Sequence, residues 1–310
     1  MAALTNQRIA YFNGDYVPED EVRISYRDRG FRLGDAAFDM TRTFNGVPFK
    51  MREHIERFFR SLKYLQIDPG LSIDDFIAIS EEVTRRNRHL IEDGGDYWVA
   101  QRVSRGLDGI DGEETAQTGP TTIVDCTPLP FRKRARAYRD GIDLLVSSVR
   151  RTPPESLSPR AKTHNYLNLI MADLEAKASD PEAWPLLLDT NGNLCEAMGC
   201  NVFVVRDGVL MTPREQFVLP GISRATVIEL AQAAGIECIE QDLDVFDAIN
   251  ADELFLSSTS LCLCPVRSVN GAPVADGAVP GPVTKRILDA YSQFVGCDFV
   301  GQYLRHCPAD

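Results

Sequence analysis

Tight turns between short apolar segments restrict the fold of this chain more than any other feature. Asn-Gly or Asp-Gly pairs stand at residues 13–14, 45–46, 191–192 and 207–208, each between strand-like segments. Such pairs favour β-hairpins, because both turn positions must adopt positive φ angles. Helix-like segments lie between the hairpin regions but do not alternate regularly with the strands. The pattern therefore predicts a mixed α+β fold.

The length of the chain and one basic segment suggest how it is divided. With 310 residues, 44% of them hydrophobic, the chain can hold two domains with a core each. The segment "TPLPFRKRARAYRDG" mixes prolines with a basic run, which is typical of a connector. We therefore predict an N-terminal domain over residues 1–131, a linker over 132–137 and a C-terminal domain over 138–310.

The balance of charges excludes several classes of protein. Lys and Arg total 33 against 45 Asp and Glu, which gives a net charge of -12 and argues against a nucleic-acid-binding or basic membrane-surface protein. No apolar run approaches the length of a membrane span, and the first residues lack the apolar core of a leader segment. We therefore expect a cytoplasmic protein with no nucleic-acid or membrane partner.

The cysteines and histidines do not form a recognisable metal site. The eight cysteines show no disulfide framework, so reduced and mostly buried thiols are expected. "CEAMGC" at 195–200 and "CLC" at 262–264 lack a matching second pair with histidines, and the chain has only four histidines. A structural zinc site needs such a set of ligands. We therefore predict that the protein uses no metal.

One lysine lies immediately before a helix-like segment. In "SPRAKTHNYLNLIMADLEAKA", residues 158–178, Lys162 precedes the first turn and lies off the apolar face. A lysine in this position is usually solvated, so the residue alone says little about chemistry. The apolar side chains recur at helical spacing and are expected to be buried on one face: Leu167, Ile170, Met171 and Leu174.

Other residues could supply what a Schiff-base lysine requires. Such a lysine needs an aldehyde cofactor, and pyridoxal 5'-phosphate (PLP) needs a phosphate site and an acidic partner for its ring nitrogen. "LPGIS" precedes a helix, whose N-terminal N–H groups favour a phosphate. Each candidate also has an ordinary interpretation as a solvated, capping or strand-end residue. The candidates are Ile222, Ser223, Thr259 and Arg57 for the phosphate and Glu196 for the nitrogen.

Seven motifs in order resemble the fold-type IV PLP aminotransferases. They are "RDRGFRLGDAAFD", "REHIERFFRS", "AKTHNYLN", "GNLCEAMGCNVFVVRDGVLMTP", "LPGISR", "SSTSLCLCPV" and "GPVTKRI", and together they extend over nearly the whole chain. That family contains branched-chain aminotransferases, D-amino acid aminotransferases, (R)-amine transaminases and aminodeoxychorismate lyase. The resemblance implies a smaller N-terminal α/β domain and a larger C-terminal domain with a hairpin-rich, β-barrel-like core.

The same resemblance implies a cofactor, an assembly and roles for particular residues. It implies bound PLP and a homodimer with residues that cross the interface. Lys162 would form the Schiff base, Glu196 would contact the pyridine nitrogen, and Tyr166 would point toward the cofactor phenolate. The residues implied for the phosphate are Arg57, Ile222, Ser223 and Thr259.

Within the family, the motifs look most like those of branched-chain aminotransferases, which exchange amino groups between amino acids and keto acids. Phe38 and Arg42 match the N-terminal substrate strand of those enzymes. Met40 stands where they usually have glycine, and "WVA" at 98–100 replaces their tyrosine-x-arginine. The preference for a carboxylate substrate therefore stays open. The candidate substrate residues are Phe38, Met40, Arg42, Trp98, Gln101 and Ser260.

Several alternatives follow from these departures. An (R)-selective amine transaminase is the main competitor, since its pocket is more apolar. The arginine and histidine of D-amino acid aminotransferases would fall near Ile110 and Gly112, and the threonine that aids the lyase would fall at Met40, so both patterns are missing. A PLP-binding protein without turnover and an interaction module without a cofactor are further hypotheses.

Overall fold

The computed structural model describes residues 7–91, 94–109 and 119–307 of the chain. It divides into two compact units, one of Met1–Leu129 with Ala161–Asn165 and one of Pro130–Arg160 with Tyr166–Asp310. Ile110 and Gly112 lie outside the described residues. The mixed α+β class is confirmed, but the Lys162 segment belongs to the N-terminal unit although both of its flanks in the sequence belong to the other.

The described part of the N-terminal unit contains a six-stranded antiparallel sheet in the order β2-β1-β6-β5-β3-β4. The predicted Asn-Gly turns connect β1 to β2 and β3 to β4. Asn13, Gly14, Asn45 and Gly46 all have positive φ angles, as two-residue hairpin turns require. The strands are β1 (Ile9–Phe12), β2 (Asp15–Pro18), β3 (Ala36–Phe44), β4 (Val47–Pro48), β5 (Tyr97–Leu107) and β6 (Gly119–Pro128).

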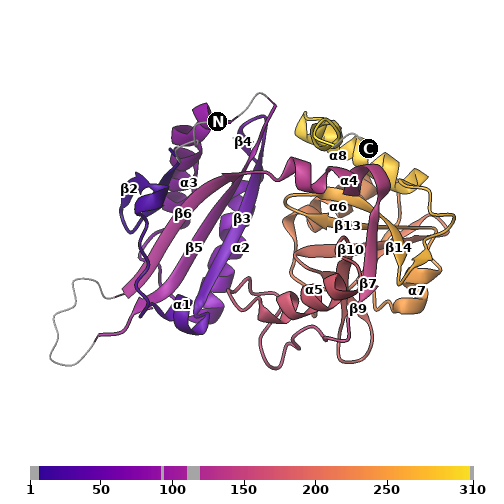
Figure 1. The fold of residues 1–310 in the computed structure, drawn as a ribbon, viewed down its shortest axis with the longest axis horizontal. Coiled ribbons are helices and arrows are strands. Elements are labelled where there is room, and N and C mark those ends of the chain that lie inside the picture. The colour runs from indigo at the N-terminus through magenta and orange to yellow at the C-terminus, as the bar shows by residue number, and fades with distance from the viewer. Residues whose placement is uncertain (1–6, 92–93, 110–118, 308–310) are drawn as a thin grey trace. The chain divides into compact units, whose positions relative to one another are not determined.

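Helices α2 (Met51–Leu65) and α3 (Ile73–Asn87) cover one face of this sheet (Figure 1). Ile55, Phe58 and Leu62 of α2 are fully buried against α3 and the sheet, and each such side chain contributes about 1.5–3 kcal/mol. The other helices of this unit are η1 (Glu19–Glu21), α1 (Arg29–Leu33) and η2 (Arg88–Leu90).

In the described part of the C-terminal unit, nine strands form one sheet, and six of them close into a barrel. Around the barrel each strand pairs with the next in the order β7-β8-β9-β10-β13-β14, and β14 pairs with β7. This confirms the barrel-like core. The strands are β7 (Ile142–Val146), β8 (Trp184–Leu188), β9 (Leu194–Ala197), β10 (Cys200–Arg206), β11 (Val209–Thr212), β12 (Cys238–Glu240), β13 (Glu253–Ser258), β14 (Cys262–Val269) and β15 (Ala272–Pro273).

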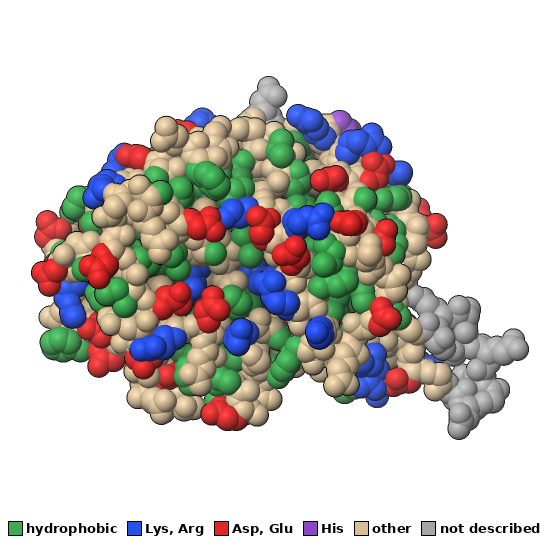
Figure 2. Space-filling view, turned by 180° about the vertical axis from the view of Figure 1, so that it is seen from behind, with side chains coloured by type: hydrophobic (Ala, Val, Ile, Leu, Met, Phe, Trp, Pro, Cys, Tyr) green, Lys and Arg blue, Asp and Glu red, His purple; other side chains and the backbone are tan. Residues whose placement is uncertain are grey.

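Helices pack around the outside of the barrel (Figure 1). Within the described residues, no helix is both long and apolar enough to cross a membrane. On the face shown in Figure 2, Lys and Arg side chains are interspersed with Asp and Glu. The helices are α4 (Phe131–Asp140), α5 (Leu167–Ser179), α6 (Ile222–Ala233), α7 (Val245–Ile249), α8 (Pro282–Val295) and α9 (Phe299–Leu304).

The predicted linker over residues 132–137 is wrong, because this segment lies inside helix α4. Phe131, Ala135 and Tyr138 are buried along one side of α4, and the basic residues lie at other positions of the helix. This spacing of four and three residues is that of an amphipathic helix. The two units instead divide between Leu129 and Pro130.

The face of α5 that was expected to be buried is exposed. The buried residues of α5 are Leu169, Ala172 and Ala176, of which the first two pack with Leu187 of β8. Alanines allow the helix to approach the strand closely, so the larger apolar residues lie on the other side. The exposed fractions are 67% for Leu167, 40% for Ile170, 49% for Met171 and 57% for Leu174.

Candidate active site

The segment that carries Lys162 pairs with the free edge of β3. Strand β4 covers only the end of β3, at Thr43 and Phe44. Along the beginning of β3, Ala37 and Thr163 form an antiparallel bridge. The Phe38 N–H donates to the Lys162 carbonyl at 3.0 Å, and the His164 N–H donates to the Ala36 carbonyl at 2.9 Å. The lysine is therefore attached to the sheet although more than a hundred residues separate it from β3.

The Lys162 side chain lies beside one of the predicted substrate residues. Its Nζ is 4.5 Å from the centre of the Phe38 ring, which is within the range of a cation–π contact. Both side chains are half-buried. The structure thus brings together the candidate catalytic amine and the candidate aromatic substrate contact.

A polar cluster lies on the buried face of α2, next to this segment. His54, Arg57 and Ser61 follow one another at helical spacing and are 1%, 3% and 1% exposed. Arg57 donates from Nε to Asp39 Oδ2 at 2.8 Å and from Nη2 to Asp39 Oδ1 at 2.7 Å, and His54 Nδ1 lies 2.7 Å from Asp39 Oδ1. Arg57 is therefore a buried residue with a bidentate carboxylate partner, and the interpretation of it as a solvated helix arginine is wrong.

The titration of this cluster follows from its burial. Burial alone would raise the pKa of Asp39, but the Arg57 charge and the bond to His54 outweigh burial and hold that pKa well below its usual range. The pKa of His54 is lowered, mainly by burial and further by the charges of Arg57 and Lys162, against the opposing effect of Asp39. The cluster therefore contains an ionised carboxylate, a guanidinium and a neutral imidazole.

A second histidine near Lys162 is also held neutral. Burial lowers the pKa of His164 to about 4, and the nearby charge of Arg102 acts in the same direction while Asp28 opposes it. His54 and His164 thus bind a proton more readily in the unfolded chain, where the pKa of histidine is about 6.5. Their contribution to stability is therefore fully present above pH 6.5 and is lost as the pH falls toward the lower pKa values of the folded protein.

We expect the free energy of unfolding to decrease as the pH is lowered from about 6.5 to 4. His164→Gln should make this decrease less steep, by up to about 1.4 kcal/mol per pH unit, because one group that takes up a proton on unfolding is removed. Urea unfolding of both proteins at several pH values checks this. An unchanged slope in the variant would mean that His164 titrates normally in the folded protein.

The predicted substrate residues of the N-terminal unit do not all share a face. Met40 pairs with Ala100 and Arg42 pairs with Trp98, so these side chains lie on the same face of the sheet as Phe38. Gln101 belongs to the opposite face. It is fully buried and its Nε2 donates to Ser80 Oγ at 2.9 Å. The prediction that Gln101 lies with the other substrate residues is therefore wrong.

Arg42 is buried and ion-paired. Its side chain is 1% exposed, Nη2 lies 3.8 Å from Asp96 Oδ2, and Nε donates to the Thr43 carbonyl at 3.0 Å. The guanidinium also lies 4.1 Å from the centre of the Phe44 ring. These contacts are those of a salt-bridged strand arginine, and the role of Arg42 as a substrate contact stays a prediction.

In the C-terminal unit, Glu196 is a buried carboxylate with two donors. It lies on β9 and is 4% exposed. Arg151 donates from Nε to Oε1 at 2.6 Å, and the Leu219 N–H donates to Oε2 at 3.2 Å. Charge-assisted bonds of this kind fix the orientation of a carboxylate. Nothing in the sequence identified Arg151 as this partner.

The loop that contains Leu219 leads into the predicted phosphate site. Ile222 and Ser223 begin α6, and its N-cap is Gly221, whose position provides no side-chain cap. A Cβ atom on Gly221 would lie 2.2 Å from Asn201 Oδ1, and Asn201 Nδ2 donates to the Leu219 carbonyl at 3.0 Å. The tight loop thus presents a helix N-terminus without a side-chain cap, and such a terminus suits a phosphate group.

The remaining predicted residues of this unit have varied surroundings. Tyr166 lies at the N-cap of α5 and packs against the cluster of Leu169, Ala172 and Leu187. Thr259 lies in the turn between β13 and β14. Ser260 is buried and its hydroxyl accepts a hydrogen bond from Arg134. The hydroxyl of Ser260 therefore has a partner within its own unit.

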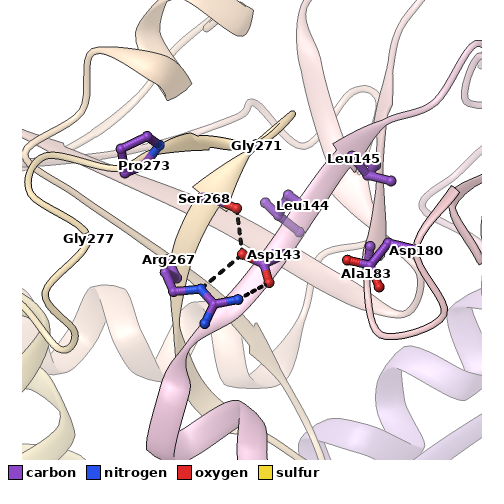
Figure 3. Close-up of a pocket in the computed structure, with 10 residues that line it drawn as sticks. All are labelled: Asp143, Leu144, Leu145, Asp180, Ala183, Arg267, Ser268, Gly271, Pro273 and Gly277. Carbon is purple, nitrogen blue, oxygen red and sulfur yellow. Dashed lines mark hydrogen bonds and ion pairs between the residues drawn. The ribbon is translucent and has the colours of Figure 1, made fainter.

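The described part of the C-terminal unit also has a surface pocket of about 460 Å³, lined by residues of the paired strands β7 and β14 and of neighbouring segments (Figure 3). Arg267 forms an ion pair there with Asp143, and Ser268 donates to the same carboxylate. The pocket contains none of the predicted site residues. In residues 7–91, 94–109 and 119–307, no three His, Cys, Asp or Glu side chains form a group that could hold a metal ion.

Comparison with a family model and curated proteins gives consistent matches. The model of the class IV amino-transferases matches residues 36–269. The branched-chain-amino-acid aminotransferase of Escherichia coli K12 is 33% identical over 287 residues, which cover 91% of each chain. The D-alanine aminotransferase of Staphylococcus aureus COL is 29% identical over 287 residues and covers 92% of this chain and 97% of its own.

Solved structures agree with these matches. A crystal structure of the Escherichia coli branched-chain amino acid aminotransferase has a TM-score of 0.84 at 32% identity and covers 94% of each chain. A branched-chain amino acid aminotransferase from T.th., solved with pyridoxamine 5'-phosphate, has a TM-score of 0.83 at 26% identity, and the match covers 97% of this chain and 96% of that one.

Proposed function

Because the chain belongs to the class IV aminotransferase family, we propose that it is a PLP-dependent transaminase that exchanges amino groups between branched-chain amino acids and keto acids. The observation that carries this proposal is the placement of Lys162. Its amine lies beside Phe38 of the candidate substrate strand while its backbone is bonded to β3. The fold and the Escherichia coli relative support the same activity.

Several residues have the chemistry that PLP needs from its binding protein. Lys162 supplies an amine for its aldehyde, the N–H groups of Ile222 and Ser223 suit its phosphate, and Glu196 is a fixed carboxylate for its ring nitrogen. The T.th. relative is described with pyridoxamine 5'-phosphate, which supports this choice. When bound, PLP would delocalise the electron pair that stays on the substrate carbon when its α-proton leaves.

The protein's own groups then have separate tasks. The amine of Lys162 would accept the α-proton of the donor and later return a proton. Glu196 keeps the ring nitrogen protonated, and Arg151 and the Leu219 N–H hold this carboxylate in one orientation. Tyr166, Thr259 and Arg57 remain predicted cofactor contacts.

We expect Arg57→Ala to lower both the stability of the protein and its retention of PLP. The Asp39 carboxylate, which is fully buried, would lose its charged partner, at a cost of about 3–5 kcal/mol. Loss of the proposed charge-assisted phosphate contact should loosen PLP roughly ten- to a hundredfold. Dialysis followed by measurement of residual PLP, with thermal unfolding, checks both effects.

A double variant separates these two roles of Arg57. Asp39→Asn combined with Arg57→Ala removes the unpaired charge, so much of the lost stability should return while PLP retention stays low. If PLP retention returns together with stability, Arg57 acts only through the fold and does not bind the phosphate.

A second candidate function has a specific observation in its favour. Because Arg42 is buried and paired with Asp96, its charge is partly compensated, so the strand is compatible with a substrate that has no carboxylate. This observation makes an (R)-selective amine transaminase the second candidate, and the D-amino acid activity named for the Staphylococcus aureus relative is a third option. A panel of L-branched-chain amino acids, D-amino acids and chiral arylalkyl amines, followed by visible absorption, distinguishes the three.

Arg42→Ala tests the carboxylate contact directly. If Arg42 orients a substrate carboxylate, transfer from amino acids should fall about ten- to a hundredfold while transfer from amines without a carboxylate changes little. The values of kcat/KM for both donor classes are compared in the parent and the variant. Equal losses for both classes would assign Arg42 to the strand structure and leave Met40 and Trp98 as the residues to test.

We further propose that the protein is a homodimer. The exposed apolar residues of α5, from Leu167 to Leu174, form a stripe that a partner would cover. Light scattering should give twice the mass of one chain at micromolar concentration. A monomer that is active under the same conditions would contradict this assembly. The expected cytoplasmic location stays a prediction.

A further inference from the structure

The backbone of Lys162 is bonded on two sides. Its carbonyl accepts from the Phe38 N–H of β3 at 3.0 Å. Its own N–H donates to Ser61 Oγ of α2 at 3.0 Å. Ser61 is 1% exposed, so its hydroxyl does not exchange this partner freely with water. Both polar groups of the lysine backbone are therefore fixed by the N-terminal unit.

Ser61 also connects the lysine to the buried cluster on α2. Its hydroxyl donates to the Arg57 carbonyl at 3.2 Å while it accepts from Lys162. Arg57 in turn binds Asp39 through two nitrogens, and Asp39 is the neighbour of Phe38. A closed ring of contacts thus passes from Lys162 through Ser61, Arg57 and β3 and returns to Lys162.

We propose that Ser61 is a positioning residue for Lys162, and this inference rests on the proposed transaminase function. The hydroxyl holds the lysine backbone against α2 and thereby keeps the amine beside Phe38. In this position the amine would react with the cofactor and transfer the proton. The segment 161–165 is short and both of its neighbours belong to the other unit. Removal of the Ser61 hydroxyl takes away the bond from the Lys162 N–H to α2, and the amine then samples a wider range of positions.

The structure offers a matched control on the neighbouring helix. Thr84 of α3 is 4% exposed and its Oγ1 donates to the Ser80 carbonyl four residues earlier, at 2.8 Å. It therefore resembles Ser61 in burial and in its helical hydrogen bond, but it lies on a different helix from the one that binds Lys162. Thr84→Val removes a buried hydroxyl with little change in shape.

The test compares Ser61→Ala, Ser61→Thr and Thr84→Val with the parent; the reaction with PLP is started from the cofactor-free proteins, and hydrogen exchange and turnover are measured after loading with PLP. Hydrogen exchange at the Lys162 amide should become about tenfold faster or more in Ser61→Ala, while exchange at the His164 amide, which is bonded to β3, should not change. The reaction with PLP should be about tenfold slower and kcat about tenfold lower, with little change in KM. Ser61→Thr keeps a hydroxyl and should restore most of both rates, and Thr84→Val should match the parent.

Two results would overturn the proposal. One is an unchanged exchange rate of the Lys162 amide in Ser61→Ala. The other is an equal loss of rate in Ser61→Ala and Thr84→Val, which would show that any buried hydroxyl has the same effect. If Ser61→Ala does not fold, the parent protein alone still tests the bond between the Lys162 N–H and Ser61. Exchange of the Lys162 amide in the parent at the rate of an exposed amide would contradict that bond. Absence of PLP binding by the parent would instead refute the proposed function, while the exchange measurement would still test the contact.

Discussion

Replacing Lys162 with alanine should abolish the covalent attachment of PLP and reduce transamination by roughly 10⁴-fold or more. In the proposed function, Lys162 supplies both the nucleophile that attaches the cofactor and the base that moves the α-proton, and a positioned base alone contributes about 10²–10⁴-fold. The proposed phosphate site at the start of α6 does not involve Lys162, so PLP should still bind without a covalent bond.

The measurement combines visible absorption with turnover. The variant should bind PLP but lack the absorption band of the attached cofactor. Lys177→Ala is the control, because Lys177 is an exposed lysine on α5 that pairs locally with Asp173. The control should keep full activity. Turnover close to that of the parent in Lys162→Ala would refute the assignment of the catalytic lysine.

Glu196→Gln should lower turnover by about a hundredfold or more while PLP remains bound and attached to Lys162. The amide keeps the shape of the carboxylate but loses its charge, so the ring nitrogen loses the partner that holds its proton. Stabilisation of charge that develops in the transition state is then lost, and removal of one such group typically costs about 10²–10³-fold. The amide would also meet two donors, Arg151 Nε and the Leu219 N–H, with only one acceptor oxygen.

A variant of a second buried glutamate in the same barrel is the control that distinguishes this loss of turnover from a loss of stability. Glu253 on β13 is 6% exposed and accepts from the N–H groups of Val283 and Thr284 at the start of α8. Glu253→Gln should lower stability with little effect on single-turnover rates. If Glu196→Gln converts the donor as fast as the parent in a single turnover, the partner of the ring nitrogen must be another residue.

Local features of the fold could be predicted from the sequence. The Asn-Gly turns are encoded by adjacent residues that tolerate positive φ angles, and the apolar face of α2 is encoded by helical spacing. The face of α5 was predicted wrongly because spacing alone does not tell which of two apolar faces is buried. The face with the alanines is the buried one, because Ala172 and Ala176 allow close packing that Leu174 would prevent.

The candidate site could be predicted only in part. Motifs identified Lys162 and Glu196 as residues of interest, but not their surroundings. The bond between Ser61 and Lys162 joins residues 101 positions apart, and no local pattern encodes it. Gln101 was misplaced because its face depends on the register between β3 and β5, where Ala100 and not Gln101 lies opposite Met40.

Transfer of labelled nitrogen tests the proposed activity most directly. The protein loaded with PLP is incubated with ¹⁵N-labelled L-leucine and an unlabelled keto acid, and the products are analysed by mass spectrometry. The account predicts that the label appears in the amino acid formed from the acceptor, in an amount equal to the keto acid formed from leucine, and that Lys162→Ala gives neither product. Absence of label in the acceptor product from every donor of the panel, with PLP bound to the parent protein, would contradict a transaminase.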